Sequence, residues 1–528
     1  MSWFQTANGH SAIIAKRLRL LQRRDIKSNL PAPGRIDESK REPNTQTSAY
    51  KVIKLSFETL REITRATYIV EPIHGSSFHG VSIDSRTVSP GELFVAIKGE
   101  RVDGHEYVQN ALEQSAAGAL VSEALPEFAQ SSSAILLVRD SHHALIELAK
   151  HYRNQVPATY LGVTGSSGKT TVKEMIAHLL NSGGARVFQS TGNFNNLYGM
   201  PLSILRMPGD TEYGVYELGV STIGEMSKLA PILSPDIAVI TNISATHLKT
   251  MGNVECVRNE KLQLFKSLNP DGIAIVNADD SALLNEARRL FPNVLSFSAQ
   301  DDSKADFVAR NVTTDLSTGY CSFEFEGARV NLHVFGEHQV ANAICALAVC
   351  SAAAAKVYPA TLESYQPQTG SLRGEIETRG GISVIADCYN ASPDAMISGL
   401  RSFFKMKLSD SSGRKIAVVG DMLELGEKSE SERLRVGAEV AKLQKTLSDS
   451  GEIGTHILIT VGLAKQIAEP FSNTNVNVIN CNDNIEAGEE LARKSSAGDM
   501  IYFKGSRGVA LEKAIEVFWE KLSERESE

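Results

Sequence analysis

The sequence predicts an α/β protein of three domains, in which short strands of parallel sheet alternate with helices. Three observations support this. A glycine-rich turn at residues 162–168 joins a strand-like run to a helix-like run. Apolar runs typical of buried parallel strands follow at 214–218, 237–241 and 272–276. A second series of such runs follows a linker that contains Pro367, Thr369 and Gly370, and lies at 382–386, 415–419, 456–461 and 500–503.

The chain has 528 residues, enough for roughly two to four domains. We place an extension at 1–50, a small α/β domain at 51–155, a central parallel-sheet domain at 156–366 and a Rossmann-like domain at 367–528. Helix-like stretches at 254–268 and 339–355 belong to the central domain.

The extension at 1–50 differs from the rest of the chain. Basic residues are concentrated at 16–24, and residues 31–47 are rich in Pro, Ser, Thr and charge. The basic stretch is compatible with a membrane-surface helix, a targeting peptide or a partner contact. We favour a solvated, disordered tail without a catalytic role.

Composition excludes several classes of protein. A net charge of −8 and a pI of about 5.9 argue against general nucleic-acid binding. No run approaches the roughly 18 apolar residues of a membrane span. The six cysteines have neither CxxC nor zinc-ligand spacing, which favours reduced thiols in the cytoplasm.

The glycine-rich turn predicts a phosphate site. Gly162, Gly165 and Gly168 allow close approach of the backbone, and the N–H groups that open the following helix favour an anion. Lys169 would reach the outer phosphates and the Thr170 hydroxyl would hold Mg²⁺. The turn therefore predicts binding of ATP or GTP.

Three further residues are candidates of unequal weight. Glu217 ends the run 214–218, at the edge of a parallel sheet where ligands bind. A carboxylate there could join Thr170 in holding Mg²⁺. His247 alone is more often structural than a ligand, and a lone Lys261 in a helix is typical of a solvated face.

The glycine spacing also resembles the ATP site of the Mur ligases and the folylpolyglutamate synthetases. Stretches across three domains resemble the Mur ligases in order and spacing, over residues 51–525. These are SIDSRTVSPGELFVAIKGERVDGHEY from 82, GVTGSSGKTT from 162, TGNFNNLYGMP from 191, ELGVSTIGEM from 217, TNISATHL from 241, RGEIETRGG from 373, DCYNASPDAM from 387, VVGDMLELGEKSE from 418 and FKGSRGVALE from 503.

The resemblance implies a role for each matched residue. Catalytic roles fall to Lys169, His247 and Lys261, with Lys261 carried as a carbamate. The residues implied in ATP binding are Gly165, Ser166, Ser167, Gly168, Lys169, Thr170, Thr171, Asn342, Arg373, Asp387 and Asn390. Those implied in substrate binding are Ser85, Arg86, Asp103, Gly104, Asn193, Asn195, Asn196, Lys504, Ser506 and Arg507. Two Mg²⁺ ions are implied, with Thr170, Glu217, His247 and Lys261 as ligands.

The implied reaction is ATP-driven amide formation through an acyl phosphate, joining D-alanyl-D-alanine to UDP-N-acetylmuramoyl-tripeptide in peptidoglycan synthesis. Domain closure around the cleft, a monomeric state and a cytoplasmic location are also expected. The sequence departs from the family pattern at Gln339, Ala386 and Arg433, all in stretches assigned to nucleotide or second-substrate binding.

Three alternatives stay open. A sister Mur ligase would add the third peptide residue, diaminopimelate or lysine, although the D-N-P-R signature of the diaminopimelate enzyme is absent. A folylpolyglutamate synthetase would share the phosphate loop but not the first domain. A nucleotide-driven switch would rest on that loop alone, and no N-K-x-D base-reading motif accompanies it.

Overall fold

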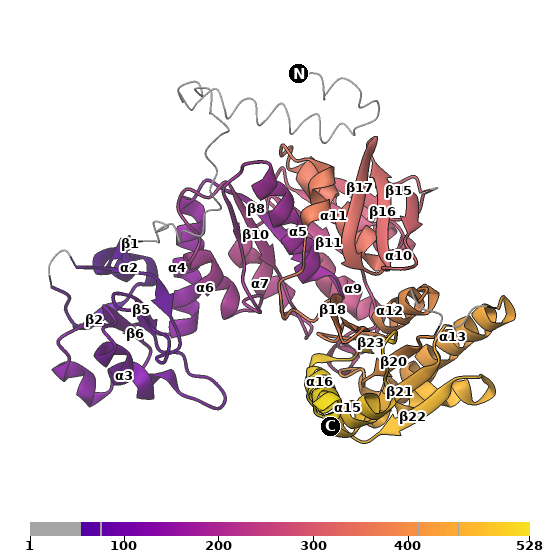
Figure 1. Cartoon of the computed structure of the whole chain (residues 1–528). Coiled ribbons are helices and arrows are strands. Elements are labelled where there is room, and N and C mark those ends of the chain that lie inside the picture. Colours follow the sequence, from indigo (N-terminus) through magenta and orange to yellow (C-terminus); the bar gives the residue numbers. More distant parts are fainter. Residues whose placement is uncertain (1–53, 74–75, 302, 409–411, 452–453, 528) are drawn as a thin grey trace, which may run out of the picture.

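The computed structural model describes residues 54–527, apart from short gaps at 74–75, 302, 409–411 and 452–453. The extension predicted at 1–50 lies outside the described residues. The described chain forms three α/β domains (Figure 1), of which the central one lies between the other two. This confirms the predicted fold class.

The first domain is built on a five-stranded sheet, in which only the edge strand β2 runs antiparallel. In sheet order its strands are β2 (Thr67–Val70), β7 (Ala134–Leu137), β6 (Gly118–Val121), β5 (Leu93–Val95) and β4 (Val81–Ser82). A separate antiparallel pair joins β1 (Lys54–Ser56) to β3 (Ser77–His79). The helices are α2 (Phe57–Thr64), α3 (Val108–Glu113) and α4 (Ser141–Gln155). Helix α4 leads directly into the central domain.

The central domain has a seven-stranded sheet in which every pair is parallel. In sheet order its strands are β14 (Phe307–Val308), β13 (Val294–Ser298), β12 (Ile273–Asn277), β11 (Ile237–Ile240), β8 (Thr159–Thr164), β10 (Tyr213–Glu217) and β9 (Val187–Gln189). Its helices are α5 (Lys169–Ser182), α6 (Gly199–Leu205), α7 (Met226–Leu233), α8 (Leu248–Met251), α9 (Val254–Leu262), α10 (Ser281–Leu290) and α11 (His338–Ala352). The phosphate loop follows β8, an interior strand, so it lies at the carboxyl edge of the sheet and not at either side of it.

A three-stranded antiparallel sheet packs on the central domain, formed by β15 (Arg310–Thr314), β16 (Tyr320–Phe325) and β17 (Ala328–Phe335). Helix α11 shares one apolar core with this sheet and with the parallel sheet. Both sides of α11 are therefore covered, which explains why most of its residues are buried and most of the buried ones are apolar.

The third domain has a six-stranded sheet, parallel except for its edge strand β18. In sheet order its strands are β18 (Glu375–Arg379), β19 (Ile382–Ala386), β23 (Met500–Lys504), β20 (Lys415–Val419), β21 (Ile457–Val461) and β22 (Asn477–Cys481). Its helices are α12 (Pro393–Lys405), α13 (Ser429–Asp449), α14 (Lys465–Ala468), α15 (Asn484–Lys494) and α16 (Glu512–Ser527). The last strand in chain order, β23, lies inside the sheet.

Candidate active site

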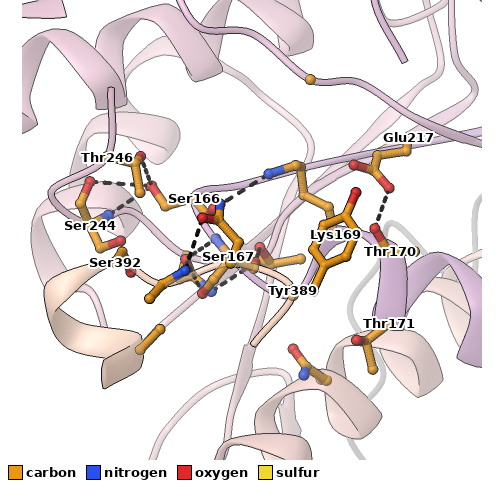
Figure 2. Close-up of a pocket in the computed structure, with 18 of the residues that line it drawn as sticks. Ser166, Ser167, Lys169, Thr170, Thr171, Glu217, Ser244, Thr246, Tyr389 and Ser392 are labelled. Carbon is orange, nitrogen blue, oxygen red and sulfur yellow. Dashed lines mark hydrogen bonds between the residues drawn. The ribbon is translucent and has the colours of Figure 1, made fainter. Parts of the chain in front are cut away.

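A cavity of about 650 Å³ lies where the central domain meets the third domain, and both contribute to its wall (Figure 2). The predicted residues that line it are Ser166, Ser167, Gly168, Lys169, Thr170, Thr171, Asn193, Asn195, Asn196, Glu217, His247, Asn342, Arg373, Asp387, Asn390 and Lys504. Segments more than 300 residues apart in the sequence, such as the phosphate loop and Lys504, therefore face one cavity.

The phosphate loop needs glycine at two positions. Gly165 has φ +152°, and a Cβ atom there would lie 1.9 Å from Thr241 Oγ1. Gly168 has φ +77°, and a Cβ atom would lie 2.4 Å from Asn342 Oδ1. Since backbone and neighbouring side chains approach this closely, any larger residue would displace the loop.

Lys169 lies folded over this loop. Its ammonium donates to Gly165 O at 3.0 Å and to Ser166 O at 3.4 Å. Burial lowers the pKa of Lys169, and the nearby Glu217 carboxylate partly opposes that shift. The site therefore places the Lys169 amine close to the backbone N–H groups of a helix N-terminus, an arrangement suited to an anion.

Glu217 is the last residue of β10 and is buried, so it is not an exposed strand end. Its Oε2 accepts a hydrogen bond from Thr170 Oγ1 at 2.7 Å (Figure 2), and its Oε1 accepts one from Asn195 at 2.9 Å. Arg373 of the third domain donates to Thr170 Oγ1 at 3.1 Å. A carboxylate and a hydroxyl that meet in a polar cavity offer oxygen ligands of the kind that Mg²⁺ prefers.

Lys261 is not on a solvated face, contrary to the expectation from its isolated place on a helix. Its side chain is 1% exposed on α9. Burial, and next the charge of Lys169, lower the pKa of Lys261 to about 7. A large share of this amine is therefore uncharged at neutral pH. Lys261 does not itself line the cavity.

His247 lines the cavity and is held by the third domain. Its Nδ1 lies 2.6 Å from Glu424 Oε2. The hydrogen bond to His247 lowers the pKa of Glu424, so that carboxyl is ionised at neutral pH. Glu424 was not predicted as a site residue, although it lies in the quoted stretch from 418.

On the third-domain side, Asp387 is buried and accepts two hydrogen bonds on Oδ2, from Tyr502 and from Lys504, each at 2.8 Å. The guanidinium of Arg373 lies 3.9 Å from the centre of the Tyr389 ring, and that of Arg507 lies 6.0 Å from it. The ring of Tyr389, which lines the cavity (Figure 2), therefore contacts Arg373 of the cavity wall, while Arg507 lies near the same ring from outside the wall.

The structure does not bring all predicted residues to this cavity. Ser85, Arg86, Asp103 and Gly104 lie in the first domain, and Gly165, Lys261, Ser506 and Arg507 do not line the cavity wall. Arg86 pairs with Asp84 and lowers the pKa of that carboxyl to about 2. Ser506 donates to Ala391 O and accepts from Leu423 N, so it connects loops behind the wall.

Sequence reasoning missed several polar residues of the wall, namely Thr241, Asn242, Ser244, Thr246 and Ser392, whereas His338, also on the wall, lies in the stretch 336–339 that the resemblance assigns to nucleotide contact. Three of their buried atoms, Ser244 Oγ, His338 Nδ1 and Ser392 Oγ, have no hydrogen-bond partner within the described part of the chain. The missed signal was position, because Asn242 and Ser244 follow β11 at the sheet edge that also carries the phosphate loop.

The three departures from the family pattern have different surroundings. Gln339 is buried and accepts from Asn342 at 2.9 Å. Ala386 ends β19 next to Asp387. Arg433 lies on α13 away from the cavity wall, where its guanidinium donates to both oxygens of Asp421 at 2.7 and 2.9 Å. Arg433 is therefore a partner of a buried carboxylate and not a cavity residue.

We expect Arg433→Ala to lower the free energy of unfolding by about 3–5 kcal/mol, because it leaves the buried Asp421 carboxylate without its cation. Urea unfolding measures this change. The matched control is Arg435→Ala, which removes another arginine of α13, one whose exposed guanidinium pairs with Asp394 of α12 and with Glu432, at a cost of about 0–1 kcal/mol. Equal losses of unfolding free energy in the two variants would contradict the role of Arg433 as the partner of a buried carboxylate.

Among residues 54–527, outside the short gaps, no group of three or more His, Cys, Asp or Glu side chains is arranged to hold a metal ion. The candidate metal ligands at the cavity are of two kinds, since the Thr170 hydroxyl lies beside the Glu217 carboxylate. Over the same residues, no helix has the length and apolar character needed to cross a membrane.

Comparison with known proteins identifies the class of this fold and site. Residues 163–350 match the Mur ligase middle domain, residues 77–153 match the catalytic domain of the Mur ligase family, and residues 373–507 match the glutamate ligase domain of Mur ligases. The chain belongs to the Mur ligase family.

Relatives within the family are more specific. The UDP-N-acetylmuramoyl-tripeptide–D-alanyl-D-alanine ligase of Bacillus subtilis is 32% identical, over 88% of this chain and 98% of its own length. The Escherichia coli ligase of the same name is 31% identical over 83% and 93%. The crystal structure of MurF from Acinetobacter baumannii has a TM-score of 0.77 at 26% identity, covering 89% of this chain and 99% of that one. MurF from Thermotoga maritima in complex with ADP has a TM-score of 0.72 at 30% identity, covering 84% and 98%.

Proposed function

We propose that this chain joins D-alanyl-D-alanine to UDP-N-acetylmuramoyl-tripeptide, with ATP as the energy source, in the synthesis of peptidoglycan precursors. The observation that carries the proposal is the match over almost the full length of ligases with this activity. The match includes the third domain and not only the phosphate loop. A switch or a binding module that shared that loop alone would not extend across all three domains.

The reaction needs a carboxylate and a phosphoryl group brought together without water. The substrate carboxylate attacks the γ-phosphorus of ATP, which releases ADP and gives an acyl phosphate. The amine of D-alanyl-D-alanine then attacks the acyl carbon and expels phosphate. Lys169 and the loop N–H groups bind the phosphate oxygens, on which negative charge gathers in the first step.

Metal binding is part of the proposal. Thr170 and Glu217 would hold one Mg²⁺ ion, and His247 with the carbamate of Lys261 would hold a second. The oxygen donors around Glu217 suit the first ion. The uncharged amine of Lys261 suits carbamate formation, because only the neutral amine attacks CO₂. Bound Mg²⁺ would supply electrostatic stabilisation of phosphate oxygens.

Substrate binding divides among the domains. Ser85, Arg86, Asp103 and Gly104 would bind the UDP part on the first domain, here bounded at 51–155. Asn193, Asn195 and Asn196 would contact the peptide at the cavity. Lys504, Ser506 and Arg507 would serve the D-alanyl-D-alanine side of the third domain, at 367–528. Asn342, Arg373, Asp387 and Asn390 would contact the nucleotide.

We further propose that the chain acts as a monomer in the cytoplasm, where ATP and UDP-linked substrates are made. Sedimentation at assay concentration tests the first part, and a dimer would refute it.

The experiment is an assay of phosphate release with ATP, Mg²⁺, UDP-N-acetylmuramoyl-tripeptide and D-alanyl-D-alanine, in which each component is omitted in turn. We expect release to need all four, and mass spectrometry to find the pentapeptide product. A parallel reaction offers UDP-N-acetylmuramoyl-dipeptide with diaminopimelate or with lysine. Product in that reaction alone would refute the proposal and identify a sister ligase.

A further inference from the structure

One contact between the central and third domains falls on a proposed metal ligand. The loop at 420–426, between β20 and α13, docks on residues 247–251. Glu424 makes two bonds there, since its side chain pairs with His247 at 2.6 Å and its carbonyl accepts from Lys249 N at 3.1 Å. Gly426 packs so closely that a Cβ atom would lie 3.0 Å from Lys249 Cα.

Both residues of the pair have unfavourable backbone conformations. His247 has φ +53° and Glu424 has φ +71°, in the left-handed region that residues other than glycine rarely adopt. Such a conformation is strained and persists only where surrounding contacts impose it. Two strained residues that face each other across a domain boundary indicate that this contact does more than hold the two domains together.

The chemistry of the pair determines the state of the imidazole. An ionised carboxylate can only accept hydrogen bonds, so His247 Nδ1 carries the proton. In the neutral ring, Nε2 is then the nitrogen with a free lone pair. His247 lines the cavity, whereas Glu424 does not. The carboxylate thus acts on the cavity only through the ring.

We propose that Glu424 is a positioning residue for His247. By docking on residues 247–251, the third domain fixes the Nδ1–H tautomer and the ring orientation, and so prepares Nε2 as a metal ligand. Carboxylates that accept from the second nitrogen of a metal-binding histidine commonly act in this way. The inference rests on the proposed function. It adds that the metal site on the central domain is complete only when the third domain is docked.

The first test reads the imidazole itself, in the absence of substrate and metal. The full chain is labelled with nitrogen-15 histidine, and His247→Gln identifies the signals of His247 among the 12 histidines. We expect the wild-type ring to carry its proton on Nδ1. Glu424→Ala should lose this preference, and Glu424→Gln should keep it in part, because the amide oxygen can still accept from Nδ1.

The second test measures catalysis as a function of Mg²⁺. We expect Glu424→Ala to raise the Mg²⁺ concentration needed for half-maximal rate about 10–100-fold, as is typical for loss of such a partner. The KM for the UDP-linked substrate should stay unchanged, because its proposed contacts are elsewhere. Glu427→Ala is the matched control, since it removes an exposed carboxylate from the 3-10 turn Gly426–Lys428 that follows this loop and should leave both measurements at wild-type values.

Unchanged His247 signals and unchanged Mg²⁺ dependence in a folded Glu424→Ala variant would overturn the inference. Thermal melting establishes folding, and Glu424→Gln supplies the same comparison if the alanine variant is unstable. A wild-type enzyme that makes no pentapeptide would instead refute the proposed function, and the spectrum of His247 would still decide the tautomer.

Discussion

Lys169→Ala should give a folded protein that forms the pentapeptide product at least about 10²–10³-fold more slowly than the wild type. The ammonium of Lys169 is the one cation held on the phosphate loop itself in the described structure, by the carbonyls of Gly165 and Ser166. Without it, the negative charge that develops on the phosphate oxygens loses the counter-charge that is positioned on the loop itself. The measurement is single-turnover phosphate release at saturating ATP, so that weaker nucleotide binding does not mask the chemical step.

Two controls make this result specific. Lys169→Met keeps an unbranched side chain of similar size without the charge and should be equally inactive, which separates charge from packing. Lys228→Ala removes an exposed lysine from α7 and should be fully active. Wild-type turnover in either folded Lys169 variant would contradict the role given to the ammonium.

Lys261→Met should also abolish ligation, and for a different reason. Unmodified Lys261 is a buried amine close to the charge of Lys169, and its pKa is about 7. Carbamate formation replaces a cation next to Lys169 with an anion, so it turns repulsion into attraction. We expect wild-type activity to fall when CO₂ and bicarbonate are removed and to return when they are restored. Lys261→Met should not respond, and should lose about 10²–10³ in rate.

The stability of the fold should depend on pH through Lys261, in a direction that follows from its pKa. The folded-state pKa of unmodified Lys261 lies below its ordinary value of 10.5. The protonated amine therefore destabilises the fold below pH 7, and this penalty disappears as the pH rises towards the ordinary value. Lys261→Met should thus raise the Tm measured at pH 6 while it abolishes ligation.

Carbon-13-labelled bicarbonate offers a direct readout for the same prediction. A carbamate signal should appear in the wild type, weaken below pH 7 as the amine protonates, and be absent from Lys261→Met. Full activity after exhaustive removal of CO₂ would rule out the carbamate.

The central sheet and the phosphate loop were predictable because their signals are local. The signal of the loop is its glycines at 162, 165 and 168, and the signal of β10, β11 and β12 is an apolar run in each strand. Both signals depend only on neighbours in the sequence. The three-stranded sheet β15–β17 was not predicted. Its strands are half exposed and form a layer around α11, which is a tertiary arrangement without a local signal.

Site residues were predictable from the sequence pattern where a backbone feature, such as a strand end, marks their position. They were not predictable from that pattern where burial in the folded protein determines their role. Glu217 could be proposed from its place at a strand end. Lys261 could be named only from the family resemblance, since the sequence places it beside Arg258 and Glu260 on a polar-looking helix, and only the fold buries it. Glu424 was missed because its partner His247 lies 177 residues away in the sequence, as their numbers show.

The position of β23 has a consequence for biosynthesis. This strand is the last of the sheet to be translated, yet it lies between β19 and β20, and Lys504 at its end pairs with Asp387. A nascent chain that stops before residue 500 would lack the central pairing of its third domain and one cation of the cavity wall. Incomplete chains would thus contain the phosphate loop but lack ligase activity, and that activity would begin only after β23 has been added to the sheet. We expect the same arrangement to slow the folding of the third domain, because its pairings join residues more than 100 positions apart, as between Ala386 and Phe503.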